Sequence, residues 1–231
     1  MKTSPDDASA VAALEGTPVS RSVSIAIVIL LSFVLLIPAL LYAPGIGILL
    51  ALAVIVILLW RRKTGLSEIG FRRQLDWVKT IGTGMLLGIV IQMAAFVLLD
   101  PLLEFLTGEV TDLSQFEGLR GDLGMLMIWL AIVWFFVVFV EEFIFRGFLM
   151  NELVNILGGS DAGLYLNLIF CAVLFGLAHW YQGPSGVLST GLVGLVLGYL
   201  FIRNGFNLWL PIFVHGFLDT VGLTMIYLDI A

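Results

Sequence analysis

Six side chains that could do chemistry stand in stretches of sequence that are otherwise almost wholly apolar. Two adjacent glutamates and an arginine occur in VEEFIFRG (140–147), directly behind a run without any charge (124–140). The chain has two histidines, which lie in FGLAH (175–179) and in HGFLD (215–219). Ionisable residues at membrane depth are costly, and they usually mark a functional site. The candidate residues are Glu141, Glu142, Arg146, His179, His215 and Asp219.

The acidic pair has the spacing from which a general base can be made. On a helix Glu142 and Arg146 are one turn apart, so the arginine can neutralise that carboxylate, whereas Glu141 lies on another face. A partnered carboxylate beside a less partnered one gives the two acids different proton affinities, and one of them can then act as a base. The alternative is that these charges mark a helix end at the cytoplasmic interface, where they are merely solvated.

Each histidine also has a neighbour one helical turn away. Phe175 and His179 share a helix face, and so do His215 and Asp219. A carboxylate next to a histidine can fix its tautomer, raise its basicity or join it in binding a metal. Taken singly, a histidine in a membrane helix is more often an interhelical hydrogen-bonding residue than a catalyst.

The depth of these groups decides whether they can meet. GGSDAG (158–163) is typical of a turn. If the helix that carries Glu141 runs on to that turn, Glu141 and His179 both lie roughly 25 Å from it. His215 lies roughly 15 Å beyond a second turn in RNGFN (203–207), again near the middle of the membrane. The side chains predicted to meet in one polar pocket, reached from the cytoplasmic side, are Glu141, His179, His215 and Asp219.

A pocket of this composition suits the activation of water for hydrolysis of a peptide bond. Glu141 would take a proton from the water, and His179 would help to hold it or bind a metal. His215, together with Asp219, would stabilise the oxyanion. Glu141, His179 and His215 could also form a zinc site with one open position, although the HExxH signature is absent. No serine or cysteine stands in a matching nucleophile motif, and the lone Cys171 is two turns from His179.

The elements that must position these groups follow from composition. Hydrophobic residues make up 60% of the 231 residues and charged residues 12%, and the mean hydropathy is +1.09. These values exclude a soluble domain and predict an all-α, polytopic transmembrane bundle. A span needs about 20 apolar residues, and the absence of long alternating strands argues against a barrel. About seven spans are predicted, at 23–42, 44–60, 81–99, 125–145, 164–181, 186–202 and 207–228.

The chain divides into three parts with different charge. Residues 1–22 are predicted to be a disordered cytoplasmic tail. Residues 23–124 hold the first three spans, a basic loop and an acidic loop, and residues 125–231 form the catalytic core. Lysine and arginine crowd between the second and third spans, whereas Arg120 alone falls in the acidic loop after the third. This bias predicts a multi-pass protein of the cell membrane with its N-terminus in the cytoplasm. The basic loop could also bind anionic lipid, although topology signalling explains it more simply.

Three motifs resemble those of one protein family. VEEFIFRG is similar to the EExxxR motif of the CPBP family, the CAAX-protease and bacteriocin-processing intramembrane proteases. FGLAH resembles the FxxxH motif of that family, and HGFLD resembles its third motif, HxxxN or HxxxD. The likeness covers about residues 125–225. Three motifs in this order are much more specific than any one alone.

The resemblance implies a helical bundle that cleaves peptide bonds near the cytoplasmic leaflet. It implies that Glu141 activates water and that His179 and His215 are the catalytic histidines. The supporting residues of the first motif would be Glu142 and Arg146. Asp219 stands where the prenyl-protein endopeptidases of the family have asparagine. An ionised aspartate accepts hydrogen bonds, so we expect it to orient His215 or to bind a metal.

The family also implies the partners. The expected substrate is a peptide or a membrane protein, prenylated C-termini among them, and no nucleic acid is expected. The short chain resembles prokaryotic members. Two alternatives stay open: a proton-coupled carrier that uses the glutamates and histidines as a relay, and a non-catalytic immunity or scaffold protein of the same fold.

Overall fold

The computed structural model describes residues 20–230, and this part of the chain contains helices and no strand. Within it, seven helical segments are long and apolar enough to cross a membrane. The predicted all-α membrane bundle is therefore confirmed. The predicted tail lies mostly outside the described residues, but its last part was wrong, because the first helix already begins at Arg21.

The spans are built from the following elements. The first three spans are α2 (Arg21–Leu40), α3 (Pro44–Arg62) and α4 (Trp77–Ala94) continued by η1 (Ala95–Leu99) and α5 (Asp100–Thr107), after which η2 (Ser114–Leu119) follows in a loop. The fourth span consists of α6 (Leu123–Ile132), η3 (Val133–Val137), α7 (Val138–Glu142), η4 (Phe143–Leu149) and α8 (Met150–Leu157). The last three spans are α9 (Asp161–Ala178), η5 (Trp180–Gln182) with α10 (Gly183–Arg203), and α11 (Trp209–Tyr227).

Two spans are longer than hydropathy predicted. The third continues to Thr107 and the fourth to Leu157, because helical hydrogen bonding does not stop where charged residues begin. Both contain π-helical turns, at η1, η3 and η4. A π-turn holds an extra residue, so it rotates the side chains that follow it around the helix axis, and such turns are frequent at functional sites. The turn η4 comes directly after Glu142.

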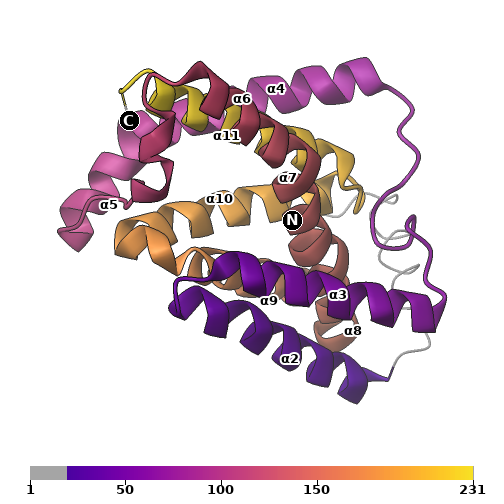
Figure 1. Cartoon of the computed structure of the whole chain (residues 1–231). Coiled ribbons are helices and arrows are strands. Elements are labelled where there is room, and N and C mark those ends of the chain that lie inside the picture. The colour runs from indigo at the N-terminus through magenta and orange to yellow at the C-terminus, as the bar shows by residue number, and fades with distance from the viewer. Residues whose placement is uncertain (1–19, 231) are drawn as a thin grey trace.

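The helices form three groups around the fourth span (Figure 1). The hairpin α2–α3 lies along one side of the bundle, and the pair α4–α11 lies along the opposite side. The pair α9–α10 packs between them, and α8 contacts both α2 and α9. The fourth span thus carries the acidic pair through the middle of the molecule, where helices from both sides can reach it.

Glycines bring the paired helices close together. A Cβ atom at Gly84 would stand 2.4 Å from Cβ of Phe213, and one at Gly88 would stand 2.6 Å from the carbonyl oxygen of Val214. Contacts this short exist only without a side chain, which is how small residues let helices approach in lipid. The close packing of α4 on α11 fixes the helix that carries His215.

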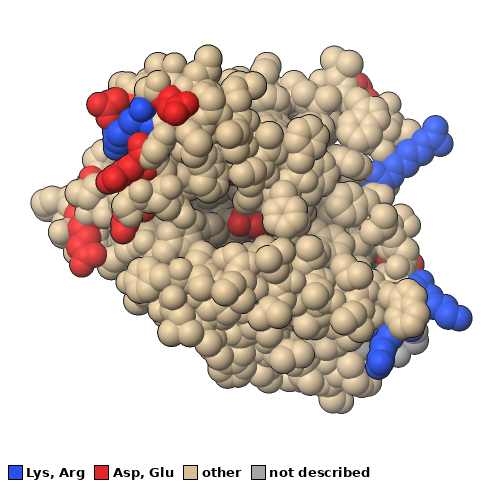
Figure 2. All heavy atoms as spheres, in the orientation of Figure 1, with Lys and Arg blue, Asp and Glu red and all other residues tan. Residues whose placement is uncertain are grey.

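The two ends of the bundle carry opposite charge. On the face drawn in Figure 2, lysine and arginine atoms gather at one end and most acidic atoms at the other. At the basic end Arg62 forms an ion pair with Glu152, which is buried instead of projecting into water. At the acidic end Arg120 pairs with Asp229. This polarity matches the charge bias from which the topology was predicted.

Candidate active site

The centre of the site is a buried ion pair within the fourth span. Nη1 of Arg146 donates a hydrogen bond of 2.8 Å to Oε1 of Glu142, as the four-residue spacing predicted. The other guanidinium nitrogen, Nη2, donates to the carbonyl oxygen of Gly194 at 3.1 Å. The guanidinium carbon lies 4.5 Å from the centre of the Phe175 ring. Arg146 therefore ties the fourth span to α9 and α10 while it neutralises Glu142.

A histidine from α11 completes this arrangement. Nδ1 of His215 lies 2.8 Å from Oε1 of Glu142. A carboxylate accepts hydrogen bonds, so this ring nitrogen carries the hydrogen and the carboxylate fixes the orientation of the imidazole. The expected role of Asp219 in orienting His215 or binding a metal stays a prediction, and Glu142 is the residue that holds Nδ1. Asp219 lies one turn further along the same helix and faces the opposite nitrogen, Nε2, at 3.6 Å.

Glu141 points towards the same nitrogen. Its Oε2 lies 3.8 Å from Nε2 of His215, beyond direct hydrogen-bond distance. The residue is 8% exposed, and no hydrogen bond to it is found among residues 20–230. In contrast, Glu142 is completely buried. The predicted division into a partnered and a less partnered carboxylate is thus present in the geometry.

His179 stands at the edge of this group. It was expected within a helix, but it follows the last residue of α9 as the C-cap. Its Nδ1 lies 2.8 Å from the carbonyl oxygen of Phe175, which can only accept, so Nδ1 carries the hydrogen and Nε2 keeps a free lone pair. The ring of Phe175 lies between the two histidines, 4.9 Å from His179 and 6.0 Å from His215. His215 and Asp219 are close enough to His179 for electrostatic interaction.

A tyrosine that the motifs did not single out also borders the site. The ring of Tyr181 lies 5.8 Å from that of His179. Its hydroxyl accepts a hydrogen bond of 3.3 Å from Gln182, whose own carbonyl oxygen accepts one of 2.9 Å from Thr190. The available signal was a polar cluster, WYQ, directly after the second motif. Tyr181 reaches His179 only because η5 turns the chain there, and hydropathy does not predict such a turn.

The donor set does not form a metal centre. In the part of the chain that the structure describes, no three His, Cys, Asp or Glu side chains are grouped so that they could hold a metal ion. Glu141 and His215 face each other, but no hydrogen bond or ion pair joins Glu141 to His179 among these residues. Zinc binding by Glu141, His179 and His215 therefore stays a prediction.

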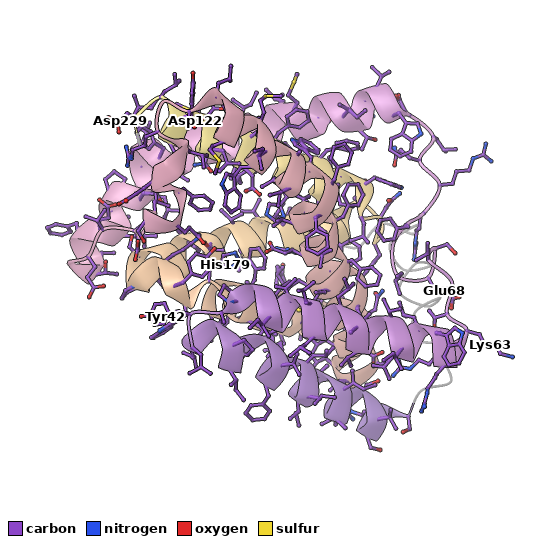
Figure 3. All side chains as sticks on the ribbon, viewed as in Figure 1. Tyr42, Lys63, Glu68, Asp122, His179 and Asp229 are labelled. Carbon is purple, nitrogen blue, oxygen red and sulfur yellow. The ribbon has the colours of Figure 1, made fainter. Side chains whose placement is uncertain are left out.

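The surface is hollowed beside this centre. Figure 2 shows a hollow near the middle of the drawn face, with acidic atoms visible inside it. The side chain of Asp219 is 24% exposed and that of Glu141 10%. In Figure 3, His179 lies between the two ends of the bundle, which are marked by Lys63 and Glu68 on one side and by Asp122 and Asp229 on the other. The site is thus inside the bundle and open at its flank.

Fold and site together define a class: a helical membrane protein with a buried Arg–Glu–His centre and a second glutamate beside it, 3.8 Å from the same histidine. Residues 123–221 match the family model described as type II CAAX prenyl endopeptidase Rce1-like. This part of the chain, which includes all six candidate residues, is therefore similar to the CAAX proteases of the CPBP family, the family that the three motifs predicted. No curated protein matches the chain. No solved structure matches it either.

Proposed function

We propose that this protein is an intramembrane endopeptidase in which Glu141 activates a water molecule for attack on a peptide bond. One observation carries the proposal: Oε2 of Glu141 and Nε2 of His215 face each other at 3.8 Å, while Glu142 holds the other nitrogen of the ring. A water oxygen could lie about 2.8 Å from each of these two atoms and so hydrogen-bond with both. The family match supports a protease.

The proposed reaction begins with transfer of a proton from this water to Glu141. The resulting hydroxide attacks the carbonyl carbon, and the carbonyl oxygen takes the negative charge. His215 acts here as the imidazolium, in which Nδ1–H donates to Glu142 and Nε2–H donates a hydrogen bond to that oxyanion. The free lone pair of His179 helps to hold the water. The carbon–nitrogen bond then breaks, and Glu141 returns its proton to the leaving amine.

Asp219 and Arg146 have different parts in this proposal. Asp219 lies 3.6 Å from Nε2 of His215 and is partly exposed, so it limits where the substrate carbonyl can lie. Arg146 holds Glu142 in position as the acceptor for His215 without touching the substrate. Zinc, which the sequence also allowed, would need movement of His179 towards Glu141. We therefore propose glutamate-dependent hydrolysis, with zinc content as a direct test.

Substrate specificity is proposed from the family description. A peptide with a prenylated C-terminal motif is the first substrate to test, because the description of the matching family names a CAAX prenyl endopeptidase. Leader peptides and segments of membrane proteins are the other candidates. Each would present an extended peptide bond next to an apolar group that remains in the bilayer.

The purified protein in detergent is expected to cleave a prenylated CAAX peptide or members of a peptide library. Cleavage should persist after treatment with a chelator, and metal analysis of the active protein should find less than one zinc per chain. Loss of cleavage with the chelator and recovery with zinc would instead establish a metalloprotease. Proton-coupled uptake in vesicles without any cleavage would favour the carrier. Absence of both activities in a folded protein would favour the non-catalytic alternative.

The route into the site is a separate proposal. His179 ends α9 at the far end from the turn that follows Leu157, and the helix between them is about 27 Å long. The acidic loop contacts the segment after His179, where the amide of Asp112 donates to the carbonyl oxygen of Gln182 at 2.9 Å. A substrate that entered from the cytoplasm, as the sequence predicted, would need a path along most of the length of α9. We propose lateral access through the hollow in Figure 2.

Cysteine labelling tests both topology and access. In a Cys171→Ala background, a cysteine at position 73 should react with an impermeant maleimide only from the cytoplasmic side, and one at position 112 only from outside. A cysteine at position 181 should react with a membrane-soluble maleimide and resist the impermeant reagent from both sides. Reaction of position 181 with the impermeant reagent from the cytoplasm would replace lateral access by the cytoplasmic route.

A further inference from the structure

A groove at the basic end of the bundle is separate from the site described above. It has a volume of about 750 Å³ and lies between the end of α3 and the fourth span. Trp60, Leu66 and Phe143 contribute apolar walls, and Arg61 and Lys63 stand at its rim. The size is that of a small-molecule binding site, and the lining combines apolar surface with positive charge.

The two cations at the rim differ from the basic residues near them. Arg62 pairs with Glu152, and Arg72 donates to the carbonyl oxygen of Gly205 at 2.9 Å. In contrast, the described part of the chain gives Arg61 and Lys63 no hydrogen bond and no ion pair, and both are exposed. The nearby acid is Glu68, and its carboxylate already accepts the amide of Gly65 at 2.7 Å. The rim therefore presents positive charge to an outside ligand.

The place of the groove indicates what kind of ligand this is. Trp60 is 78% exposed at the end of a spanning helix, where tryptophan typically lies at the level of lipid headgroups. Exposed Val56 and Ile57, one turn back towards the membrane centre, continue the apolar surface into the bilayer. A ligand in this groove thus has its charged part at the interface and its apolar part in lipid.

We propose that the groove binds an anionic phospholipid. The phosphate of the headgroup lies on Arg61 and Lys63, and an acyl chain runs over Trp60, Leu66 and Phe143. A soluble phosphate would leave the apolar walls without a partner, and a zwitterionic lipid would bring an ammonium group next to the two cations. The chain of the bound lipid packs against Phe143, which directly follows Glu142 in the fourth span, so the lipid supports the helix that carries the site.

Lipid retention measures this binding without any assay of catalysis. The full chain is reconstituted in phosphatidylcholine vesicles that contain phosphatidylglycerol, extracted gently in detergent and weighed by native mass spectrometry. Wild-type protein should retain phosphatidylglycerol in preference to phosphatidylcholine. Each basic residue near a membrane surface strengthens binding about five-fold, so Arg61→Gln/Lys63→Gln should reduce retention roughly 25-fold. The double variant Arg73→Gln/Lys79→Gln is the control, because it removes the same charge from exposed positions outside the groove.

The outcomes separate a built site from diffuse attraction. Loss of retention in the groove variant alone supports the proposal. Equal loss in both variants would mean that only the summed charge of this end attracts lipid. No loss in either variant would mean that the groove holds no anionic lipid. Both results would overturn the proposal. Retention of glycerophosphoglycerol, the headgroup without chains, as strongly as the whole lipid would overturn the role of the apolar walls. None of these results depends on whether the protein is a protease.

Discussion

Replacing Glu141 with glutamine is expected to lower kcat by about 10²- to 10⁴-fold, with little change in KM. The amide has nearly the same shape as the carboxyl group, but it cannot take a proton from the bound water. The substitution leaves the fold unaffected, because no hydrogen bond to Glu141 is found in the described part of the chain. The kinetic constants for a cleaved peptide and the midpoint of thermal unfolding in detergent measure the two effects separately.

Two further variants make this test specific. Glu141→Asp keeps the carboxylate, but the side chain is one methylene group shorter, so this variant should retain part of the activity. Glu117→Gln makes the same chemical change at an exposed position in the loop before α6, and it should be indistinguishable from wild type. Full activity in Glu141→Gln would reject Glu141 as the general base.

Replacing Arg146 with methionine is expected to lower the free energy of unfolding by about 3–5 kcal/mol. Glu142 and Arg146 are almost completely buried, so removal of the guanidinium leaves a carboxylate without its main partner inside the bundle. The methionine also loses the hydrogen bond to Gly194 and the contact with the Phe175 ring. Equilibrium unfolding in mixed detergent micelles measures the change.

Arg203→Met is the matched control for this prediction. Arg203 is exposed at the end of α10, so its loss should change the free energy of unfolding by less than about 0.5 kcal/mol. The double variant Arg146→Met/Glu142→Gln should be destabilised by less than the sum of the two single variants, because the residues act on one another directly. Equal effects of Arg146→Met and Arg203→Met would show that the buried pair contributes nothing to stability.

The two predictions assign opposite roles to neighbouring carboxylates. Glu142 bonds Arg146 and His215 through one oxygen, so it holds three spanning helices in place. Among residues 20–230 no such bond to Glu141 is found, and its side chain is 10% exposed. A carboxylate that stabilises the fold and another that is free for chemistry therefore stand side by side in one turn of helix. The proposed hydrolysis would use this arrangement, because proton transfer at Glu141 would leave the hydrogen bonds of Glu142 in place.

The local part of this arrangement could be read from the sequence. The spacing of Glu142 and Arg146 predicted their ion pair, because residues four apart on a helix are neighbours whatever surrounds them. The long apolar runs predicted seven spans, because a bilayer admits few other structures. The three motifs predicted the family, and the match over residues 123–221 confirmed it.

Contacts between distant segments could not be read in the same way. Besides its ion pair with Arg146, Glu142 accepts a hydrogen bond from His215, which is 73 residues away. Glu152 is buried and pairs with Arg62, which is 90 residues away. Neither contact has a local signal, because each depends on how helices rotate and cross when they pack.

The sequence by itself determined that this chain has seven helices that can span a membrane and that these carry an acid pair, His215 and an aspartate, since apolar length and helical spacing are local properties. Only the tertiary structure decided which carboxylate holds His215 and which one is left to face the hollow. The π-turn after Glu142 and the glycine-mediated approach of α4 to α11 set the rotation and the position of the two helices concerned, and both are consequences of packing across the whole bundle.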